Sequence, residues 1–450
     1  MPVRRAVISL VVPTIISQLV TVVYNMADTF FIGQMGDPNQ VAAASLCMPL
    51  FILLTGIANL FGIGGASLIA RSLGEGRPEK ARHAAAFSLW TAIAVSGLYG
   101  ILLYLFGSIL LPAIGANEGT FGFCRQYTFW TITVGAVPTV LNALLAHLVR
   151  AEGCSRQASI GMTLGAALNI VLDPLLISVL HLEIAGAAMA TMISNLIATG
   201  YFVVLILRKG SGTVLSLDPR EYSVRDRIPS EVLLVGLPSS MMNLMGVASN
   251  ITVNRLMVSY CNEAVAGIGI AKKIDMLAFA IATGMSQGAL PLVGYNYSAK
   301  NYRRMMSAVK TTFAFSLLLA VTGAVLLFTC AQVLVQAFID DALTVEYGMY
   351  FQKVICITGP CISVTMILIT MFQAVGKKVQ PLVLSLLRKG GLDIPLMLIM
   401  NRFFAEKGIV WATPAADFGA MLAAICLFIP FWKELKHKSQ TSETKMGGTI

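Results

Sequence analysis

The sequence predicts an all-α integral membrane protein of about twelve transmembrane helices, because of its composition, its apolar windows and an internal repeat. Of its 450 residues, 56% are hydrophobic and only 12% are charged, and the mean hydropathy is +0.77. A typical soluble domain carries about 25% charged residues. The chain is therefore expected to reside in a lipid bilayer.

The apolar windows are each long enough for a helix to cross the roughly 30 Å hydrocarbon core of a membrane. Only helices and closed barrels satisfy all their backbone hydrogen bonds in lipid, and windows this long and continuous exclude a barrel. Transmembrane helices are expected near 8–33, 41–68, 84–110, 123–149, 157–180, 184–207, 231–259, 264–292, 308–331, 347–373, 379–401 and 409–432.

The second half of the chain repeats the first with an offset near 224 residues. Because six spans is an even number, both halves enter the membrane from the same side, as in the parallel repeats of several secondary transporters. We expect a six-helix bundle over 1–207, a cytoplasmic linker over 208–230, a second six-helix bundle over 231–435 and a disordered cytoplasmic tail over 436–450. Matching positions include Pro13 with Pro238, Asn25 with Asn250, and Gly153 with Gly376.

The basic residues predict the orientation of the chain. One set of alternate loops and both termini hold most of them, whereas the opposite loops offer only Arg125, Arg402 and Lys407. Lysine and arginine concentrate in cytoplasmic loops, so both termini are expected on the cytoplasmic side of the plasma membrane. The net charge of +10 follows from this topology. Because these residues lie in separate short loops, they do not indicate nucleic-acid binding.

The first span carries a polar stripe on an otherwise apolar helix. Gln18, Thr21, Asn25 and Asp28 are three, four and three residues apart, so they share one helix face. An ionised aspartate in hydrocarbon costs at least about 2.5–3.5 kcal/mol, and an intramembrane carboxylate is by default a functional candidate. We predict that Asp28 takes part in binding a charged species.

Partners for Asp28 are expected in the fifth and sixth spans. Asn169 and Asp173 are four residues apart and share a helix face, and Thr191 lies in the following span. At 1.5 Å per residue, Asp28, Asp173 and Thr191 all lie roughly 8–11 Å below the outer surface, so they can converge. Two carboxyl groups in one buried pocket cannot both remain charged unless a cation neutralises them. The pocket is expected to bind H⁺ or Na⁺; alternatively, these side chains only link helices by hydrogen bonds.

Further charged and polar residues within the spans suggest a central cavity for a cationic substrate. Lys272 and Asp275 are one turn apart and are expected to neutralise each other, although Asp275 could face the cavity instead. Arg388 and Lys389 are expected to extend toward the membrane surface or to pair with Asp393. The predicted substrate-binding residues are Tyr24, Asn25, Asn243, Asp275, Arg388 and Asp393.

No motif in the sequence indicates an enzyme. Residues 284–288 match the G-x-S-x-G pattern of serine hydrolases, but they lie in an apolar helix without the preceding strand that the motif requires. No phosphate-binding Walker loop is present, so ATP is not expected to drive the protein. The eight cysteines are scattered without metal-site spacing. A membrane-embedded enzyme or receptor is therefore a poor alternative.

A set of motifs is spread over nearly the whole chain: Pro13, Asp28 and Gly33; 62–66; 74–76; 150–153; Asn169-Ile170; Asp173-Pro174; and 294–297. Together these motifs resemble those of the multidrug and toxic compound extrusion family. The resemblance implies two six-helix bundles forming a V-shaped cavity, and a first-bundle cation site made by Asp28, Asn169, Asp173 and Thr191. A second-bundle site of the kind found in another bacterial branch is not expected, because 238–254 and 358–375 contain no acid.

The expected function is a secondary active antiporter that exports amphipathic organic cations in exchange for H⁺ or Na⁺. Binding of the ion at Asp28 and Asp173 would shift the first helix and displace the drug, and rocking of the bundles would then return the loaded carrier inward. The sequence does not choose between the two ions. No cofactor is expected, and the protein is expected to be a monomer. The alternative is a flippase for a lipid-linked precursor, which would need a cationic cavity; Asp275 and Asp393 argue against it.

Overall fold

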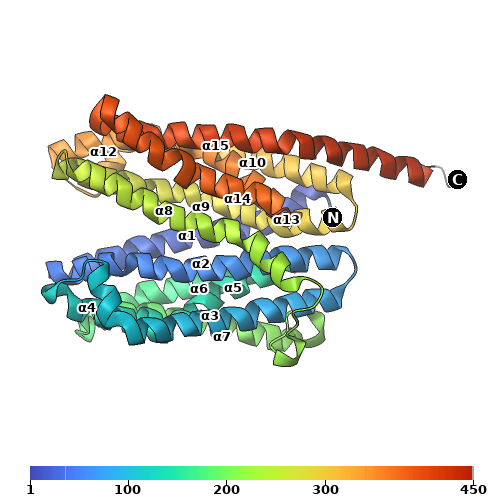
Figure 1. The fold of residues 1–450 in the computed structure, drawn as a ribbon, viewed down its shortest axis with the longest axis horizontal. Coiled ribbons are helices and arrows are strands. Elements are labelled where there is room, and N and C mark those ends of the chain that lie inside the picture. The colour runs from blue at the N-terminus through green and yellow to red at the C-terminus, as the bar shows by residue number, and fades with distance from the viewer. Residues whose placement is uncertain (36, 340, 448–450) are drawn as a thin grey trace. The chain divides into compact units, whose positions relative to one another are not determined.

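The computed structural model describes residues 1–35, 37–339 and 341–447, and these residues form helices without any strand (Figure 1). Short π-helical segments interrupt the spans at η1 (Phe129–Val134), η2 (Leu175–Val179) and η6 (Leu387–Asp393), and short 3₁₀ turns lie at η3 (Gly210–Gly212), η4 (Pro219–Glu221) and η5 (Cys356–Thr358). The α-helices are α1 (Val3–Gly33), α2 (Pro38–Gly74), α3 (Pro78–Ala113), α4 (Glu118–Thr128), α5 (Ala136–Ala151), α6 (Ser155–Pro174), α7 (Glu183–Lys209), α8 (Ile228–Val258), α9 (Asn262–Ser298), α10 (Tyr302–Thr329), α11 (Ala331–Gln336), α12 (Ala342–Ile355), α13 (Gly359–Ala374), α14 (Val379–Leu386) and α15 (Ile394–Gly447).

The helices confirm a multi-span membrane protein. Within the described chain, nine helical segments are long and apolar enough to cross a bilayer, or ten if the pair Glu118–Val134 and Ala136–Ala151, bent by 50°, forms one span. The last segment, Val379–Thr441, contains two predicted spans, which are separated where Ala405 adopts a φ of 53°. The predicted span 264–292 lies within α9.

The chain divides into two compact units. The N-terminal unit comprises Leu19–Leu73 and Arg77–Asn243, and the C-terminal unit comprises Met1–Gln18, Gly74–Gly76 and Leu244–Ile450. The two units are defined by contacts between residues, so each combines segments from different parts of the chain. Their bounds therefore differ from those of the bundles expected at 1–207 and 231–435. Helices α1 and α8 each contribute their first part to one unit and their last part to the other.

Specific contacts place the first parts of α1 and α8. Val7 and Val11 of α1 form a buried cluster with Met285, Ala289 and Ala308 in the C-terminal unit. In the N-terminal unit, a Cβ on Gly236 of α8 would lie 1.8 Å from the Leu60 carbonyl oxygen of α2. Glycine therefore allows the two backbones to approach closely, as small residues commonly do between transmembrane helices.

The remaining helices of the N-terminal unit pack around α5, α6 and α7. These three helices contact one another, and α3 contacts α5 (Figure 1). Gly161 and Gly165 of α6 face Phe202 and Ala198 of α7, where an added Cβ would lie 2.3 Å and 3.1 Å from the facing side chain. This close packing brings the polar residues of α6 and α7 within hydrogen-bonding distance.

The core of the C-terminal unit lies where α8, α9, α12 and α15 meet. Its buried residues include Met257, Ala271, Phe351, Met397 and Ala412. Helix α15 continues to Gly447, so the described part of the predicted tail is helical. An ion pair between Lys438 and Glu434, one turn apart on its surface, supports this extension.

Candidate functional site

Three of the predicted cation-site residues lie together inside the N-terminal unit. Asn169 and Asp173 of α6 are 2% and 0% exposed, and Thr191 of α7 is 5% exposed. They lie near the end of α6, which becomes the π-helical segment η2 directly after Pro174. Buried polar groups in a membrane helix need partners from neighbouring helices, and the three side chains supply partners to one another.

Asn169 lies at the centre of this arrangement. With the amide oriented to suit its neighbours, Nδ2 donates to Asp173 Oδ2 at 2.9 Å, and Oδ1 accepts from the Thr191 backbone N at 3.2 Å and Oγ1 at 3.3 Å. Asn169 thus fixes one carboxylate oxygen of Asp173 and joins α6 to α7. Asn169 and Asp173 lie four residues apart on α6, and this spacing places both side chains on the face where Asn169 contacts Thr191 of α7.

The fourth predicted residue, Asp28 of α1, completes the group. It is half-buried, and it lies within electrostatic range of Asp173. Oδ1 of Asp28 and Oδ1 of Asp173 are both inaccessible to solvent and accept no hydrogen bond from any described residue. Two buried carboxylate oxygens without donors form an arrangement that can accept a proton or ligate a cation.

Two tyrosines border the carboxylates. Tyr24, one turn before Asp28 on α1, interacts with Thr191 and lies within electrostatic range of both aspartates. Tyr127 of α4 also lies within electrostatic range of Asp28, Asp173 and Tyr24. Sequence reasoning placed Tyr24 in the substrate cavity and missed Tyr127. A tyrosine inside an apolar window is the only sequence signal that could have indicated Tyr127.

A second layer of amides supports the site. Asn142 Nδ2 of α5 donates to Asn195 Oδ1 of α7 at 2.8 Å, and Asn195 Nδ2 donates to the Thr191 carbonyl oxygen at 3.0 Å and to Thr139 Oγ1 at 3.2 Å. These bonds connect α5 to the α7 turn that carries Thr191. The position of Thr191 is therefore defined by three helices.

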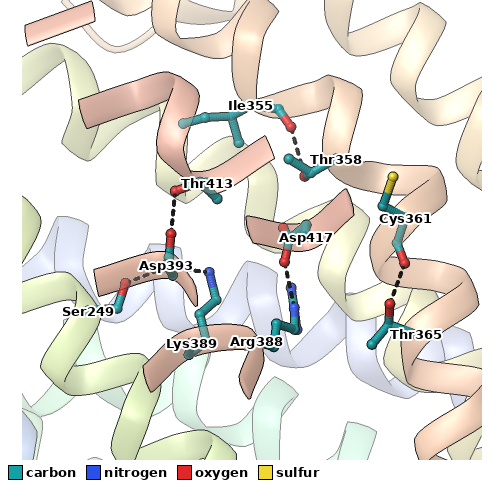
Figure 2. Close-up of polar contacts among 10 residues, drawn as sticks. All are labelled: Ser249, Ile355, Thr358, Cys361, Thr365, Arg388, Lys389, Asp393, Thr413 and Asp417. Carbon is teal, nitrogen blue, oxygen red and sulfur yellow. Dashed lines mark hydrogen bonds and ion pairs between the residues drawn. The ribbon is translucent and has the colours of Figure 1, made fainter. Parts of the chain in front are cut away.

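The C-terminal unit holds a separate cluster of charges (Figure 2). Asp393, at the end of η6, is fully buried and accepts from Ser249 Oγ at 2.7 Å, Lys389 Nζ at 3.1 Å and Thr413 Oγ1 at 3.1 Å. Both carboxylate oxygens of Asp393 therefore accept hydrogen bonds from neighbouring side chains.

Arg388 pairs with Asp417, not with Asp393. Arg388 Nε lies 2.6 Å from Asp417 Oδ1 of α15, and both side chains are buried (Figure 2). Of the two alternatives expected for these side chains, extension toward the membrane surface or pairing with Asp393, Lys389 follows the second and Arg388 follows neither. Sequence reasoning missed Asp417, although an acid within an apolar window was a signal that it used elsewhere.

Lys272 and Asp275, expected either to neutralise each other or to leave Asp275 facing the cavity, form no ion pair within the described chain. Lys272 Nζ donates instead to Asn250 Oδ1 at 2.7 Å. Oδ1 of Asp275 is buried and has no hydrogen-bonding partner among the described residues. The two side chains interact electrostatically without forming an ion pair.

A cavity of about 260 Å³ lies within the C-terminal unit, between α8, α9, α15 and η6. Of the predicted substrate residues, Asp275 lines this cavity. Asp393 and Arg388 are buried in the contacts described above. Asn25 and Asn243 are half-buried side chains of the N-terminal unit.

Buried carboxylates on several helices and a repeated helical fold together define a membrane transporter. The MatE family model matches the chain twice, over residues 13–175 and 238–399. The chain therefore belongs to this family, the multidrug and toxic compound extrusion transporters, and the two matches confirm the internal repeat predicted from the sequence.

Two staphylococcal export proteins and one crystal structure resemble the chain over nearly its full length. Multidrug export protein MepA of Staphylococcus aureus (strain N315) is 29% identical over 427 residues, covering 95% of this chain and 93% of that protein. Multidrug export protein MepA of Staphylococcus saprophyticus is 30% identical over 417 residues, covering 92% and 91%. A crystal structure of a MATE transporter in complex with MaL6 shares the fold, with a TM-score of 0.92, 23% identity, and coverage of 97% of this chain and 98% of that one.

Proposed function

We propose that the protein is a secondary active multidrug efflux antiporter that exports amphipathic organic cations in exchange for H⁺ or Na⁺. One observation carries the proposal: Asn169, Asp173 and Thr191 form a buried hydrogen-bonded group, Asp28 lies within electrostatic range of Asp173, and one oxygen of each aspartate has no donor among the described residues. The names of the staphylococcal relatives support export of drugs.

The residues of the site suit either coupling ion. Na⁺ prefers several oxygen ligands, as other hard cations do, and the site offers carboxylate, amide and hydroxyl oxygens. A proton requires only one of the carboxylates. In both cases the ion removes the repulsion between two acids held in a low-dielectric environment.

The proposed mechanism is mutual exclusion between ion and drug. A ligand shifts a conformational equilibrium only by its differential affinity for the two states. Because α1 carries Asp28 and also runs from the C-terminal unit into the N-terminal unit, ion binding at Asp28 can change the course of this helix. The change would release the drug outward, and the ion-loaded carrier would then return to the inward-open state.

We also propose that the protein works as a monomer in the plasma membrane, with both termini in the cytoplasm and without ATP. The positive loops support this orientation.

The test is ethidium export by purified protein in liposomes under an imposed ion gradient. We expect Asp28→Asn to reduce ion-driven export to the background of empty liposomes, because the variant can neither release a proton nor neutralise Na⁺. Asp226→Asn is the matched control: Asp226 is exposed in the linker with a φ of 52°, a conformation that asparagine tolerates. Export by Asp28→Asn at the wild-type rate would refute the mechanism.

A further inference from the structure

The cavity of the C-terminal unit has a charge opposite to that expected for a cation-binding pocket. Its lining includes three lysines, Lys272, Lys273 and Lys389, but one acid, Asp275. The unit's other two buried acids are already paired, Asp393 with Lys389 and Asp417 with Arg388. Neither of these acids is available to attract a cationic ligand.

The remaining charges leave an excess of positive charge in the wall. Lys272 donates to the neutral amide of Asn250 at 2.7 Å. Lys273 forms no hydrogen bond or ion pair with any described residue. Asp275 is the one acid in the cavity lining, and its Oδ1 accepts no hydrogen bond in the described chain. With Lys389 paired to Asp393, Lys272 and Lys273 exceed Asp275 by one positive charge, which an anion would balance and a cation would increase.

The rest of the cavity wall is mostly apolar, with Ser249, Asn250 and Thr413 as its polar residues. Val253, Ile268, Met276, Phe279 and Ile409 line it alongside the lysines. Small-molecule sites commonly combine mostly apolar walls with a few polar groups that fix orientation. The volume of about 260 Å³ lies slightly below the roughly 300–1,000 Å³ range of drug-sized sites, so only a compact ligand fits.

We propose that this cavity binds an amphipathic monoanion, in which a carboxylate or phosphate group meets Lys272 and Lys273 and an apolar tail lies along Phe279 and Met276. Ammonium groups bind carboxylates and phosphates through charge-assisted hydrogen bonds, which are stronger than neutral ones. The inference concerns a different unit from the cation site and does not rest on the proposed antiport.

The test is calorimetric binding of three probes with the same eight-carbon chain to the purified full-length protein in neutral detergent. Octanoate is expected to bind, and octylammonium and 1-octanol are expected to bind more weakly. Lys273→Gln should weaken octanoate binding by about tenfold, because a hydrogen bond to a charged group contributes about 1.5–3 kcal/mol. Lys310→Gln is the matched control, since Lys310 is exposed on α10 and outside the cavity.

Two further variants keep the test decisive if Lys273→Gln folds poorly. Lys273→Arg should retain octanoate binding within about threefold, because it keeps the charge, and Lys272→Gln should weaken binding as Lys273→Gln does. Tighter binding of octylammonium than of octanoate would overturn the proposal. Unchanged octanoate binding in both lysine-to-glutamine variants would overturn it as well.

The source of the anion is resolved by repeating the titration in phosphatidylcholine nanodiscs with and without phosphatidylglycerol. Competition by phosphatidylglycerol would identify a lipid headgroup as the occupant. Octanoate affinity that is the same in both membranes would identify a free organic anion. Both outcomes support an anion site, and loss of octanoate binding in both kinds of nanodisc would contradict it.

Discussion

At the scale of single residues, the proposed function depends on two carboxylate oxygens. Oδ1 of Asp28 and Oδ1 of Asp173 are buried and receive no hydrogen bond from the described chain, while Asp173 Oδ2 is held by Asn169. Asp393, in contrast, accepts hydrogen bonds on both carboxylate oxygens. These bonds satisfy the carboxylate without a ligand. The difference between Asp173 and Asp393 therefore supports the proposed ion-binding role of Asp173 and a structural role of Asp393.

Thr191 and Thr199 provide a matched pair for this distinction. Both are buried on α7, but Thr191 Oγ1 contacts Asn169, whereas Thr199 Oγ1 donates to the Pro138 carbonyl oxygen. Thr191→Val should reduce ion-driven export in liposomes by about fivefold, since a hydrogen bond between neutral groups contributes about 1 kcal/mol. Thr199→Val should lower only the stability. Equal export by the two variants would remove Thr191 from the site.

Helical spacing predicted that Asn169 and Asp173 share one face of α6 and lie near Thr191, because such spacing depends on regular α-helix geometry. It did not find the partner of Arg388, because Asp417 is 29 residues away on α15. A contact between separate helices depends on tertiary packing. Spacing alone could not reveal it.

At the scale of elements, glycine positions determine which helices approach closely. Gly236 of α8 lies against the Leu60 carbonyl oxygen of α2, while Gly246 of the same helix has no atom within 4 Å of an added Cβ. The apolar windows correctly predicted which segments are helical. The internal repeat contained no information on how α1 and α8 are divided between the units, because contacts with residues far apart in the sequence determine that division.

The two glycines of α8 make a direct comparison. Gly236→Ala should lower the thermal stability of the detergent-purified protein, because overpacking costs about 1–3 kcal/mol or more. Gly246→Ala should leave stability unchanged or raise it slightly, since alanine favours a helix over glycine. Equal melting temperatures for the two variants would show that α2 and α8 do not pack as described.

The start of α12 predicts a dependence on pH outside the membrane. Asp341 accepts hydrogen bonds from Thr344 N at 2.8 Å and Thr344 Oγ1 at 2.7 Å, and these bonds lower the pKa of the Asp341 carboxyl. A lowered pKa in the folded state means that the cap stabilises the helix above the unfolded pKa of about 3.9. The stabilisation is lost as the pH falls through the lower, folded-state pKa.

Hydrogen exchange of the Thr344 amide measures this effect. In the wild type the amide should be protected near neutral pH and should lose protection, relative to the intrinsic exchange rate, as the solution becomes strongly acidic. Asp341→Asn keeps a capping side chain and should remove the pH dependence. The same pH profile in both proteins would show that Asp341 does not cap α12 through its carboxylate.

At the scale of the whole molecule, composition and periodicity were sufficient to predict a multi-span helical membrane protein, and the repeat was sufficient to predict two related halves. The family model, matching over 13–175 and 238–399, confirms both. The charge of the C-terminal cavity could not be predicted, because Lys272 and Asp275 are one turn apart and yet Lys272 bonds to Asn250. Only three-dimensional packing shows which acids are already paired.

The most direct test of the central claim is whether drug and ion displace each other from the purified protein. Ethidium binding in weakly buffered detergent solution should release about one proton per drug molecule, or should weaken as Na⁺ is added, and Asp28→Asn should abolish the effect. If ethidium binds the wild type without releasing protons and with an affinity independent of Na⁺, the account of ion and drug exchange through Asp28 and Asp173 is wrong.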